Sequence, residues 1–221
     1  MATNLDLEEQ EQLDQLKHFW QQWGNAISTC LAVVALAYLA YTSWNYWQRH
    51  QAAQATVLFD TVERAQKGAD LVLMERAVAD IKDKFGKTVY ASQAALLLAQ
   101  VLLEKDRQDD AQTQLQWAVD HGADAGYQTI ARLRLSALLI DKKQNEAARQ
   151  LLSATVPVAY QPLVQDRLGD LALLEGKKSD AIGLYQSAWR AMDPRAEYRR
   201  LLEIKLASLG VEPKAQPTDK P

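Results

Sequence analysis

The sequence has little cysteine, histidine, glycine or proline, and each shortage excludes a class of protein. Cys30 is the single cysteine among 221 residues, so neither an intramolecular disulfide nor a cysteine metal cluster is available. The three histidines, His18, His50 and His121, are too scattered along the chain to suggest a metal site. Glycine and proline number nine and six, and this scarcity beside abundant alanine, leucine and glutamine favours helices throughout.

The chain also has no excess of charge and no recognisable catalytic motif. A formal net charge of -3 argues against nucleic acid, whose phosphates need a concentrated basic surface. Gly86–Lys87–Thr88 resembles the end of a phosphate-binding loop, but the glycine required five positions earlier is Ile81. No isolated pair of carboxylates can be named as acid and base. We therefore expect neither an enzyme nor a bound cofactor.

Charge is absent altogether from the thirty residues between His18 and Arg49. About 20 apolar residues suffice to cross a bilayer, and aromatic side chains collect at membrane interfaces. The aromatic residues here are Phe19, Trp20 and Trp23 before the run, and Trp44, Tyr46 and Trp47 after it. The alternatives are a buried core helix and a cleaved signal peptide, but the sixteen residues before Lys17 are acidic rather than basic. The pattern predicts a transmembrane helix over 23–47 that stays as an anchor.

The flanks of this span do not fix its orientation. Lys17 alone precedes it and several basic residues follow, which leans weakly towards a cytoplasmic C-terminus, yet large domains translocate largely regardless of charge. Small residues recur along one face of the span, where a second helix could approach closely. This candidate helix-packing face consists of Gly24, Ser28, Ala32 and Ala35. An alanine-rich span also contains such a stripe by chance.

Beyond Arg49 the apolar residues recur every three or four positions, which predicts amphipathic helices. Three segments share a period close to the 34 residues of tetratricopeptide repeats. The clearest segment contains Leu168, Gly169, Ala172, Ala181, Tyr185, Ala188 and Pro194. An earlier one has Leu98, Ala99, Leu102, Ala111, Leu115 and Ala118, and a looser one has Leu135, Ser136, Leu139, Ala148, Leu152 and Thr155. The alternative is an ordinary helical bundle with accidental spacing.

Further helices are expected on both sides of the repeats. Residues 51–67 continue from the membrane helix after a bend, and 71–84 form a second helix that ends at Gly86. A terminal helix over 195–209 carries Arg199, Arg200, Glu203 and Lys205 as the polar outer face of a cap. The predicted fold is therefore all-α, a transmembrane helix followed by a tetratricopeptide-like α-solenoid. Its segments are an acidic cytoplasmic tail (1–22), the transmembrane helix (23–47), the repeat domain (48–210) and a disordered tail (211–221).

A stacked helical array presents a concave surface to peptides or partner proteins. The inward positions of the first helices give a candidate groove of Gln93, Leu96, Leu97, Gln100, Leu103, Ile130, Leu133, Arg134, Ala137, Asp166, Arg167, Asp170 and Leu173. This mixture of apolar and polar side chains suits loose binding of unfolded or extended segments. For any one leucine, the alternative is packing against a neighbouring helix. Arrays that clamp a C-terminal carboxylate use Asn and Lys at positions held here by Gln100, Ala137 and Asp170, so that clamp is not expected.

Several segments together resemble one family over nearly the full chain: LDQLKHFWQQWGNAI and SWNYWQRHQ in the tail and span, and ASQAALLLAQ, RLRLSALLI and LGDLALLEGKKSDAIGLYQSAW in the repeats. The family that they resemble is the YfgM-type ancillary subunit of the bacterial SecYEG translocon. The resemblance implies a single-pass inner-membrane protein with a cytoplasmic N-terminus and a periplasmic repeat domain. The implied partners are SecYEG, a membrane-anchored periplasmic chaperone and exported client polypeptides. It implies no catalytic residue and no cofactor.

Three functions remain open at this point. The leading one is a translocon-associated scaffold or chaperone that helps to hand exported chains to periplasmic chaperones. The second is a negative regulator of an envelope-stress response, in which the acidic tail between Asp6 and Asp14 holds a cytoplasmic factor. The third is an assembly factor for another envelope complex. Fold similarity does not discriminate among them, because one scaffold serves many partners.

Overall fold

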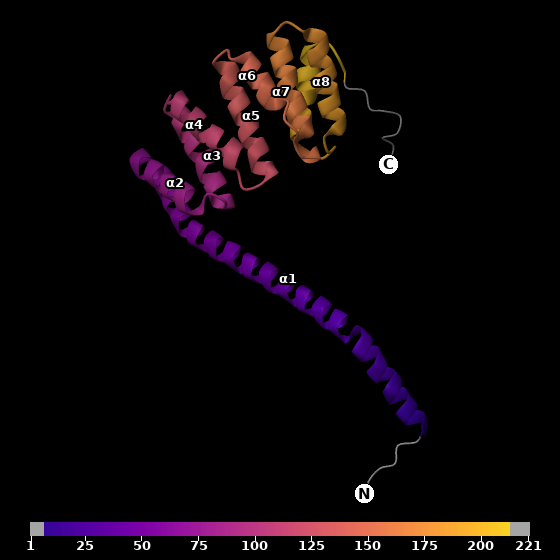
Figure 1. Cartoon of the computed structure of the whole chain (residues 1–221). Coiled ribbons are helices and arrows are strands. Elements are labelled where there is room, and N and C mark those ends of the chain that lie inside the picture. Colours follow the sequence, from indigo (N-terminus) through magenta and orange to yellow (C-terminus); the bar gives the residue numbers. More distant parts are fainter. Residues whose placement is uncertain (1–6, 213–221) are drawn as a thin grey trace. The chain divides into compact units, whose positions relative to one another are not determined.

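The computed structural model describes residues 7–212, and its regular structure within that range is helical (Figure 1). The helices are α1 (Leu7–Lys67), α2 (Leu71–Phe85), α3 (Val89–Glu104), α4 (Gln108–His121), α5 (Ala125–Asp141), α6 (Asn145–Leu152), η1 (Val158–Tyr160), α7 (Gln161–Leu174), α8 (Lys178–Ala191) and α9 (Tyr198–Ser208). The predicted all-α class is confirmed. Residues 1–6 of the expected acidic tail and 213–221 of the expected disordered tail lie outside the described residues.

The chain divides into two compact units, residues 1–50 and 51–221. In the first unit, α1 contains a helical stretch that is long and apolar enough to cross a membrane, and none of its most apolar window is buried in protein. Leu31, Leu36 and Tyr38 are among its exposed large side chains. An apolar surface of this extent suits lipid better than water. Residues 51–67, expected to continue from the membrane helix, are the end of the same α1, because the helix is uninterrupted from Leu7 to Lys67.

Turns of one geometry recur through the second unit. A residue with positive φ stands at Ala69, Asp106, Lys143, Gly176 and Gly210, at intervals of 37, 37, 33 and 34 residues. After Asp106, the N–H of Arg107 donates to the carbonyl oxygen of Leu102 at 2.8 Å, and the other four turns have the equivalent bond at 2.8 to 3.0 Å. This bond satisfies a helix-end carbonyl in the way a Schellman motif does. The period therefore extends on both sides of the three predicted repeats, and the end of α1 with α2 forms a further helix pair.

Within each repeat, small residues let the paired helices touch. Ala99, Ala111, Ala148 and Ala181 are buried, as the spacing predicts. At Gly169 a Cβ would lie 2.6 Å from Cε1 of Tyr185, so the ring of Tyr185 occupies the space of the missing side chain. The prediction for Thr155 is wrong: α6 ends at Leu152, and Thr155 lies in the loop that follows.

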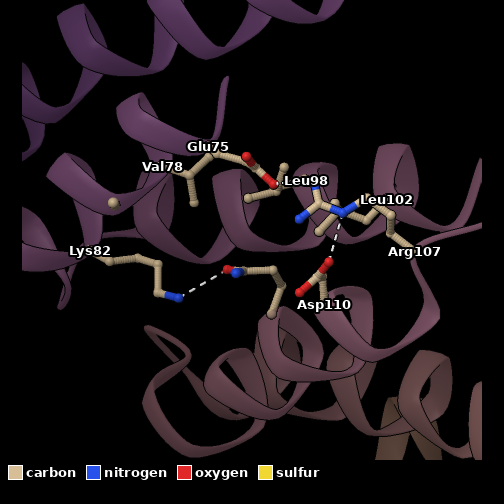
Figure 2. A pocket seen from close by; sticks show the side chains of 9 residues that line it. Glu75, Val78, Lys82, Leu98, Leu102, Arg107 and Asp110 are labelled. Atoms are coloured by element: carbon tan, nitrogen blue, oxygen red, sulfur yellow. Dashed lines mark hydrogen bonds and ion pairs between the residues drawn. The ribbon is translucent and has the colours of Figure 1, made fainter. Parts of the chain in front are cut away.

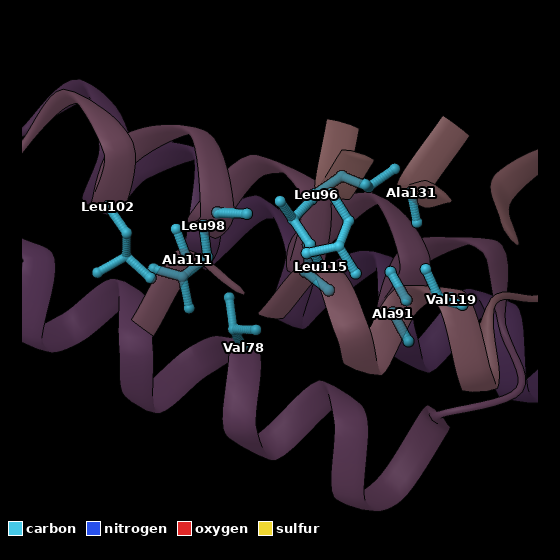
Figure 3. Packing of buried hydrophobic residues seen from close by; sticks show 14 of the residues in the cluster. Val78, Ala91, Leu96, Leu98, Leu102, Ala111, Leu115, Val119 and Ala131 are labelled. Carbon is cyan, nitrogen blue, oxygen red and sulfur yellow. The ribbon is translucent and has the colours of Figure 1, made fainter. Parts of the chain in front are cut away.

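Buried apolar side chains form two separate clusters. The first extends from the end of α1 to α6, and Figure 3 shows Val78, Leu98, Leu102 and Leu115 packing in it. The second belongs to α7, α8 and α9 and contains Tyr185, Trp189, Leu202 and Leu206, among others. These clusters stabilise the array by removing apolar surface from water.

The terminal helix α9 differs from its prediction in two ways. It begins at Tyr198 rather than Arg195, and only part of its polar face points outward. Lys205 bonds to carboxylates of α7, and Glu203 accepts a hydrogen bond from Nε1 of Trp189 at 3.1 Å. Arg199 lies over the Trp189 ring, 4.0 Å from its centroid. Arg200 is left as the exposed member of the predicted outer face.

Candidate protein-binding groove

A groove of about 580 Å³ crosses the first helices α3, α5 and α7, and α4 and α9 complete its lining. Its lining and the predicted groove have some residues in common. Seven of the predicted residues line it: Gln100, Leu103, Ile130, Leu133, Arg134, Ala137 and Arg167. A volume of this size is in the usual range of ligand pockets.

The remaining predicted groove residues have other positions. Leu96 is buried in the first apolar cluster and Leu97 packs against it. Nε2 of Gln93 donates to the hydroxyl of Tyr127 at 2.8 Å, across to the next repeat. Leu173 is partly exposed but does not line the groove.

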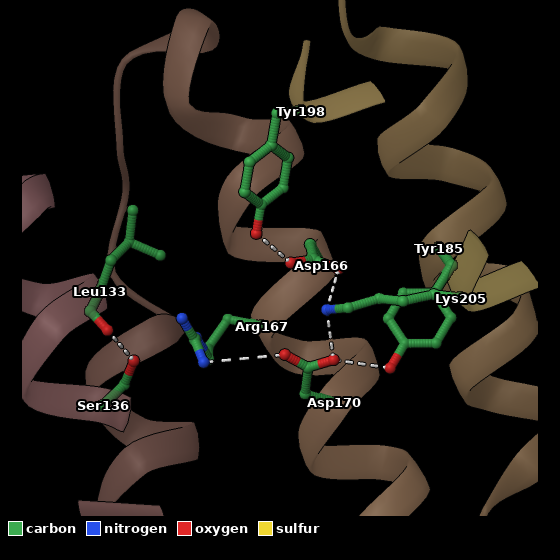
Figure 4. Close-up of polar contacts among 8 residues, drawn as sticks. All are labelled: Leu133, Ser136, Asp166, Arg167, Asp170, Tyr185, Tyr198 and Lys205. Atoms are coloured by element: carbon green, nitrogen blue, oxygen red, sulfur yellow. Dashed lines mark hydrogen bonds and ion pairs between the residues drawn. The ribbon is translucent and has the colours of Figure 1, made fainter. Parts of the chain in front are cut away.

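Asp166 and Asp170, also predicted for the groove, are engaged by the C-terminal helices (Figure 4). Asp166 is only 1% exposed, and it accepts bonds from the Tyr198 hydroxyl and from Nζ of Lys205, both at 2.7 Å. Asp170 accepts from Nζ of Lys205 at 2.6 Å and from the Tyr185 hydroxyl at 2.7 Å. These bonds fix Tyr198 as a wall of the groove and compensate the cost of burying the Asp166 charge.

The same cluster suppresses ionisation of its tyrosines. Burial raises the pKa of Tyr185 above its ordinary value, and the hydrogen bond to Asp170 with that carboxylate's charge raises it further. For Tyr198 the pKa is raised by burial first and by Asp166 second. Both rings therefore stay neutral donors at physiological pH.

Sequence reasoning missed seven groove residues. Glu104 and Asp141 lie one helical turn beyond the predicted Gln100 and Ala137, so helical periodicity alone could have found them. Ala99, Leu115, Leu138 and Leu163 line the groove with apolar atoms. Tyr198 gave no local signal, because it reaches the groove only through the packing of α9 on α7 and α8.

A second cavity, of about 170 Å³, lies among α2, α3 and α4 (Figure 2). Nζ of Lys82 bonds to Oε1 of Gln114 at 2.9 Å and lies 4.6 Å from the centroid of the Trp117 ring. Burial lowers the pKa of Lys82. Arg107 pairs with Glu75 at 2.6 Å and Asp110 at 2.7 Å. The charged groups here have partners within the protein, Arg107 in the two carboxylates and Lys82 in Gln114 and the Trp117 ring, which fits a structural contact between repeats.

Metal-binding clusters of three or more His, Cys, Asp or Glu side chains are not found in the part of the chain that the structure describes. In the candidate helix-packing face of the membrane segment, Ser28, Ala32 and Ala35 are exposed. Gly24 is buried, because the indole of Trp20 covers it: a Cβ there would lie 3.3 Å from Cδ1 of Trp20. A helix approaching along this face would meet Trp20 at that end.

Comparison with known proteins covers both units. Residues 17–211 match the family described as "Tetratricopeptide repeat-like domain". A Neisseria gonorrhoeae protein named "Ancillary SecYEG translocon subunit" is 31% identical over 204 residues, which are 92% of this chain and 98% of that relative. Proteins of the same name from Escherichia coli and Haemophilus influenzae are 26% identical over 209 residues and 27% identical over 182 residues. They are covered over 97% and 89% of their length, and 92% and 82% of this chain is matched.

Proposed function

This chain belongs to the family of ancillary SecYEG translocon subunits, and we propose that it is a non-enzymatic, single-pass subunit of the bacterial inner-membrane translocon. In this proposal the repeat domain binds segments of exported polypeptides and helps to hand them to a membrane-anchored periplasmic chaperone. Residues 1–22 are cytoplasmic, 23–47 cross the membrane, and 48–210 are periplasmic. This orientation follows the resemblance and not the weak charge bias around Lys17.

The groove across α3, α5 and α7 is the observation that carries the proposal. Its lining is mostly apolar, with Leu103, Ile130, Leu133 and Leu163 among the side chains that surround it. Leu103 is 40% exposed, and contact with an apolar partner would remove this apolar surface from water, which lowers the free energy. A few polar groups among apolar walls suit binding of extended segments without strict sequence demands.

Site-specific photocrosslinking in intact cells tests this proposal. A photoreactive residue replaces Leu103 in the groove, and the matched control replaces Thr113, which is exposed on α4 and lies outside the groove. We expect adducts to translocon components, periplasmic chaperones or nascent secretory chains from Leu103 and not from Thr113. Adducts confined to cytoplasmic proteins, or equal adducts from both positions, would contradict the proposal.

A further inference from the structure

The groove contains charged side chains that the protein leaves without a close ionic partner. Arg134 lies among Ile130, Leu133 and Ala137, and Nη1 donates to the carbonyl oxygen of Leu96 at 3.2 Å. That bond holds the guanidinium against α3 but supplies no negative charge. Among residues 17–212, no carboxylate lies within 4.0 Å of Arg134.

Arg167 occupies the equivalent position one repeat later, 33 residues along the chain. Nη1 is 3.7 Å from Oδ2 of Asp170, and Nε is buried without a hydrogen-bond acceptor. Asp170 already accepts two shorter bonds from Lys205 and Tyr185, so its attraction for Arg167 is shared. The two arginines therefore make the middle of the groove a place where an additional carboxylate would be bound favourably.

The end of the groove carries the opposite charge. Glu104 and Asp141 stand at the last helical residues of α3 and α5, again at equivalent positions in successive repeats. Glu104 accepts a bond from Gln100, which carries no charge, and neither carboxylate has a Lys or Arg nitrogen within 4.0 Å among residues 17–212. These two carboxylates could therefore form ion pairs with a basic side chain of a bound segment.

The separation of the two charges sets the spacing of a matching ligand. Arg134 and Asp141 are seven residues apart on α5, which is two turns and roughly 10 Å along the helix axis. An extended polyproline II chain advances roughly 3.1 Å per residue and has about three residues per turn. Residues three positions apart therefore point to the same side and lie about 9 Å apart, close to this distance. Unlike charges placed in register across an interface give specificity as well as faster association.

Building on the proposed function, we infer that the groove selects extended apolar segments carrying an internal acidic residue and, three residues away, a basic one. The acidic side chain pairs with Arg134 and Arg167, and the basic one with Glu104 and Asp141. Leu103, Ile130, Leu133 and Leu163 contact the apolar residues between and around them. Segments without this charge pair still bind through their apolar side chains, but more weakly.

Peptide binding to the full chain in lipid nanodiscs tests the inference. The probes are fluorescent peptides with the core Leu-Glu-Leu-Leu-Lys-Leu, the same core in reverse order, and versions with Gln in place of Glu. We expect one order to bind about tenfold or more tightly than its Gln version, because charge-assisted hydrogen bonds are lost. The preference should weaken as salt is added.

Two substitutions locate the effect. Arg134→Gln should weaken the preference for Glu, because only Arg167 then remains to pair with it, whereas Arg132→Gln, on the same helix but outside the groove lining, should keep the full preference. Arg134→Glu should reverse the preference towards a peptide with Lys in place of Glu. Thermal unfolding of each variant checks that the repeat domain remains folded, and the comparison of Glu and Gln peptides on the unchanged protein needs no variant.

The outcomes separate the inference from the proposed function. Equal binding of Glu and Gln peptides, with Leu103 adducts still present in cells, would overturn the charge selection and leave client binding in place. Equal loss in the Arg134 and Arg132 variants would overturn the role of Arg134. Absence of peptide binding together with absence of Leu103 adducts would overturn both.

Discussion

At the scale of single residues, the contact between α7 and α8 depends on Gly169 having no side chain. Gly169→Ala would place Cβ 2.6 Å from Tyr185, whose ring is buried and whose hydroxyl is bonded to Asp170, so the ring cannot move aside freely. We expect a loss of about 1–3 kcal/mol in the free energy of unfolding from overpacking. Chemical denaturation followed by helical circular dichroism measures it.

Gly183→Ala is the matched control for this prediction. Gly183 is also helical, in α8, but it is exposed and a Cβ there would meet nothing within 4 Å. Helix propensity alone then acts, and we expect the protein to gain roughly 0.5–1 kcal/mol of stability. A gain of stability in both variants would show that Tyr185 does not restrict the space at Gly169.

The buried tyrosine Tyr185 also predicts a loss of stability in alkali. Its pKa is higher in the folded protein than in the unfolded chain, mainly because of burial. The unfolded chain therefore loses its proton first, so this stabilisation is complete below about pH 10 and decreases as the pH rises further. Tyr185→Phe should make the unfolding midpoint fall less steeply between about pH 10 and pH 11. An unchanged slope would contradict a protonated, buried Tyr185.

At the scale of elements, the turns share one backbone geometry although the residue with positive φ differs from turn to turn. Glycine at 176 and 210 signals a left-handed residue, but the equivalent positions are Ala69, Asp106 and Lys143. No pattern predicts positive φ at an alanine or a lysine. There the backbone bond to the preceding helix and the packing of the paired helices determine the conformation, and tertiary structure overrides the local preference.

Substitutions at Lys143 and Gly176 should therefore change the stability of the protein in opposite directions. Lys143→Gly relieves the strain of φ +61° and should stabilise the protein by roughly 1 kcal/mol. Gly176→Ala should destabilise it by about the same amount, because an alanine is strained at φ +76°. No neighbouring atom lies within 4 Å of the new Cβ, so backbone strain is the only effect expected. Melting temperatures of the two variants test the pair. A loss of stability in both would mean that contacts of the Lys143 side chain outweigh backbone strain.

The sequence predicted some other features of the helices and did not predict the rest. The buried alanines were predictable because the repeat template fixes their spacing. The early end of α6 was not, since the weak match at Thr155 concealed an eight-residue helix followed by a loop. Lys205 was expected on an outer face because a charged residue is usually solvated. Its partners Asp166 and Asp170 lie 39 and 35 residues away in sequence, beyond the reach of periodicity.

At the scale of the whole molecule, the predicted groove and the observed cavity overlap unequally from helix to helix. All four predicted positions on α5 line the cavity. On α3 only Gln100 and Leu103 of the five do, because Leu96 and Leu97 belong to the packing of the first apolar cluster and Gln93 bonds to Tyr127. On α7 the template failed at Asp166 and Asp170, since α9 covers the positions that would otherwise be open. Which face is concave can thus be predicted from a repeat, whereas what a terminal helix covers cannot.

The proposed topology predicts a labelling pattern in cells. In a Cys30→Ser background, Gln116→Cys on the exposed side of α4 should react with a membrane-impermeant maleimide while the inner membrane is intact. Gln10→Cys, in the tail before the span, should react only after lysis. The reverse pattern would place the repeat domain in the cytoplasm and contradict the proposed periplasmic function.

The groove lies where the two apolar clusters meet, with Ile130 packed against the first cluster and Leu163 against the second. A polypeptide held there would touch both, although the clusters share no buried residue. Anything that binds only the folded protein raises its stability, by an amount that grows with the logarithm of the ligand concentration once this exceeds Kd. A bound client would therefore bridge the two cores and strengthen their association, and its release would take that support away from its carrier.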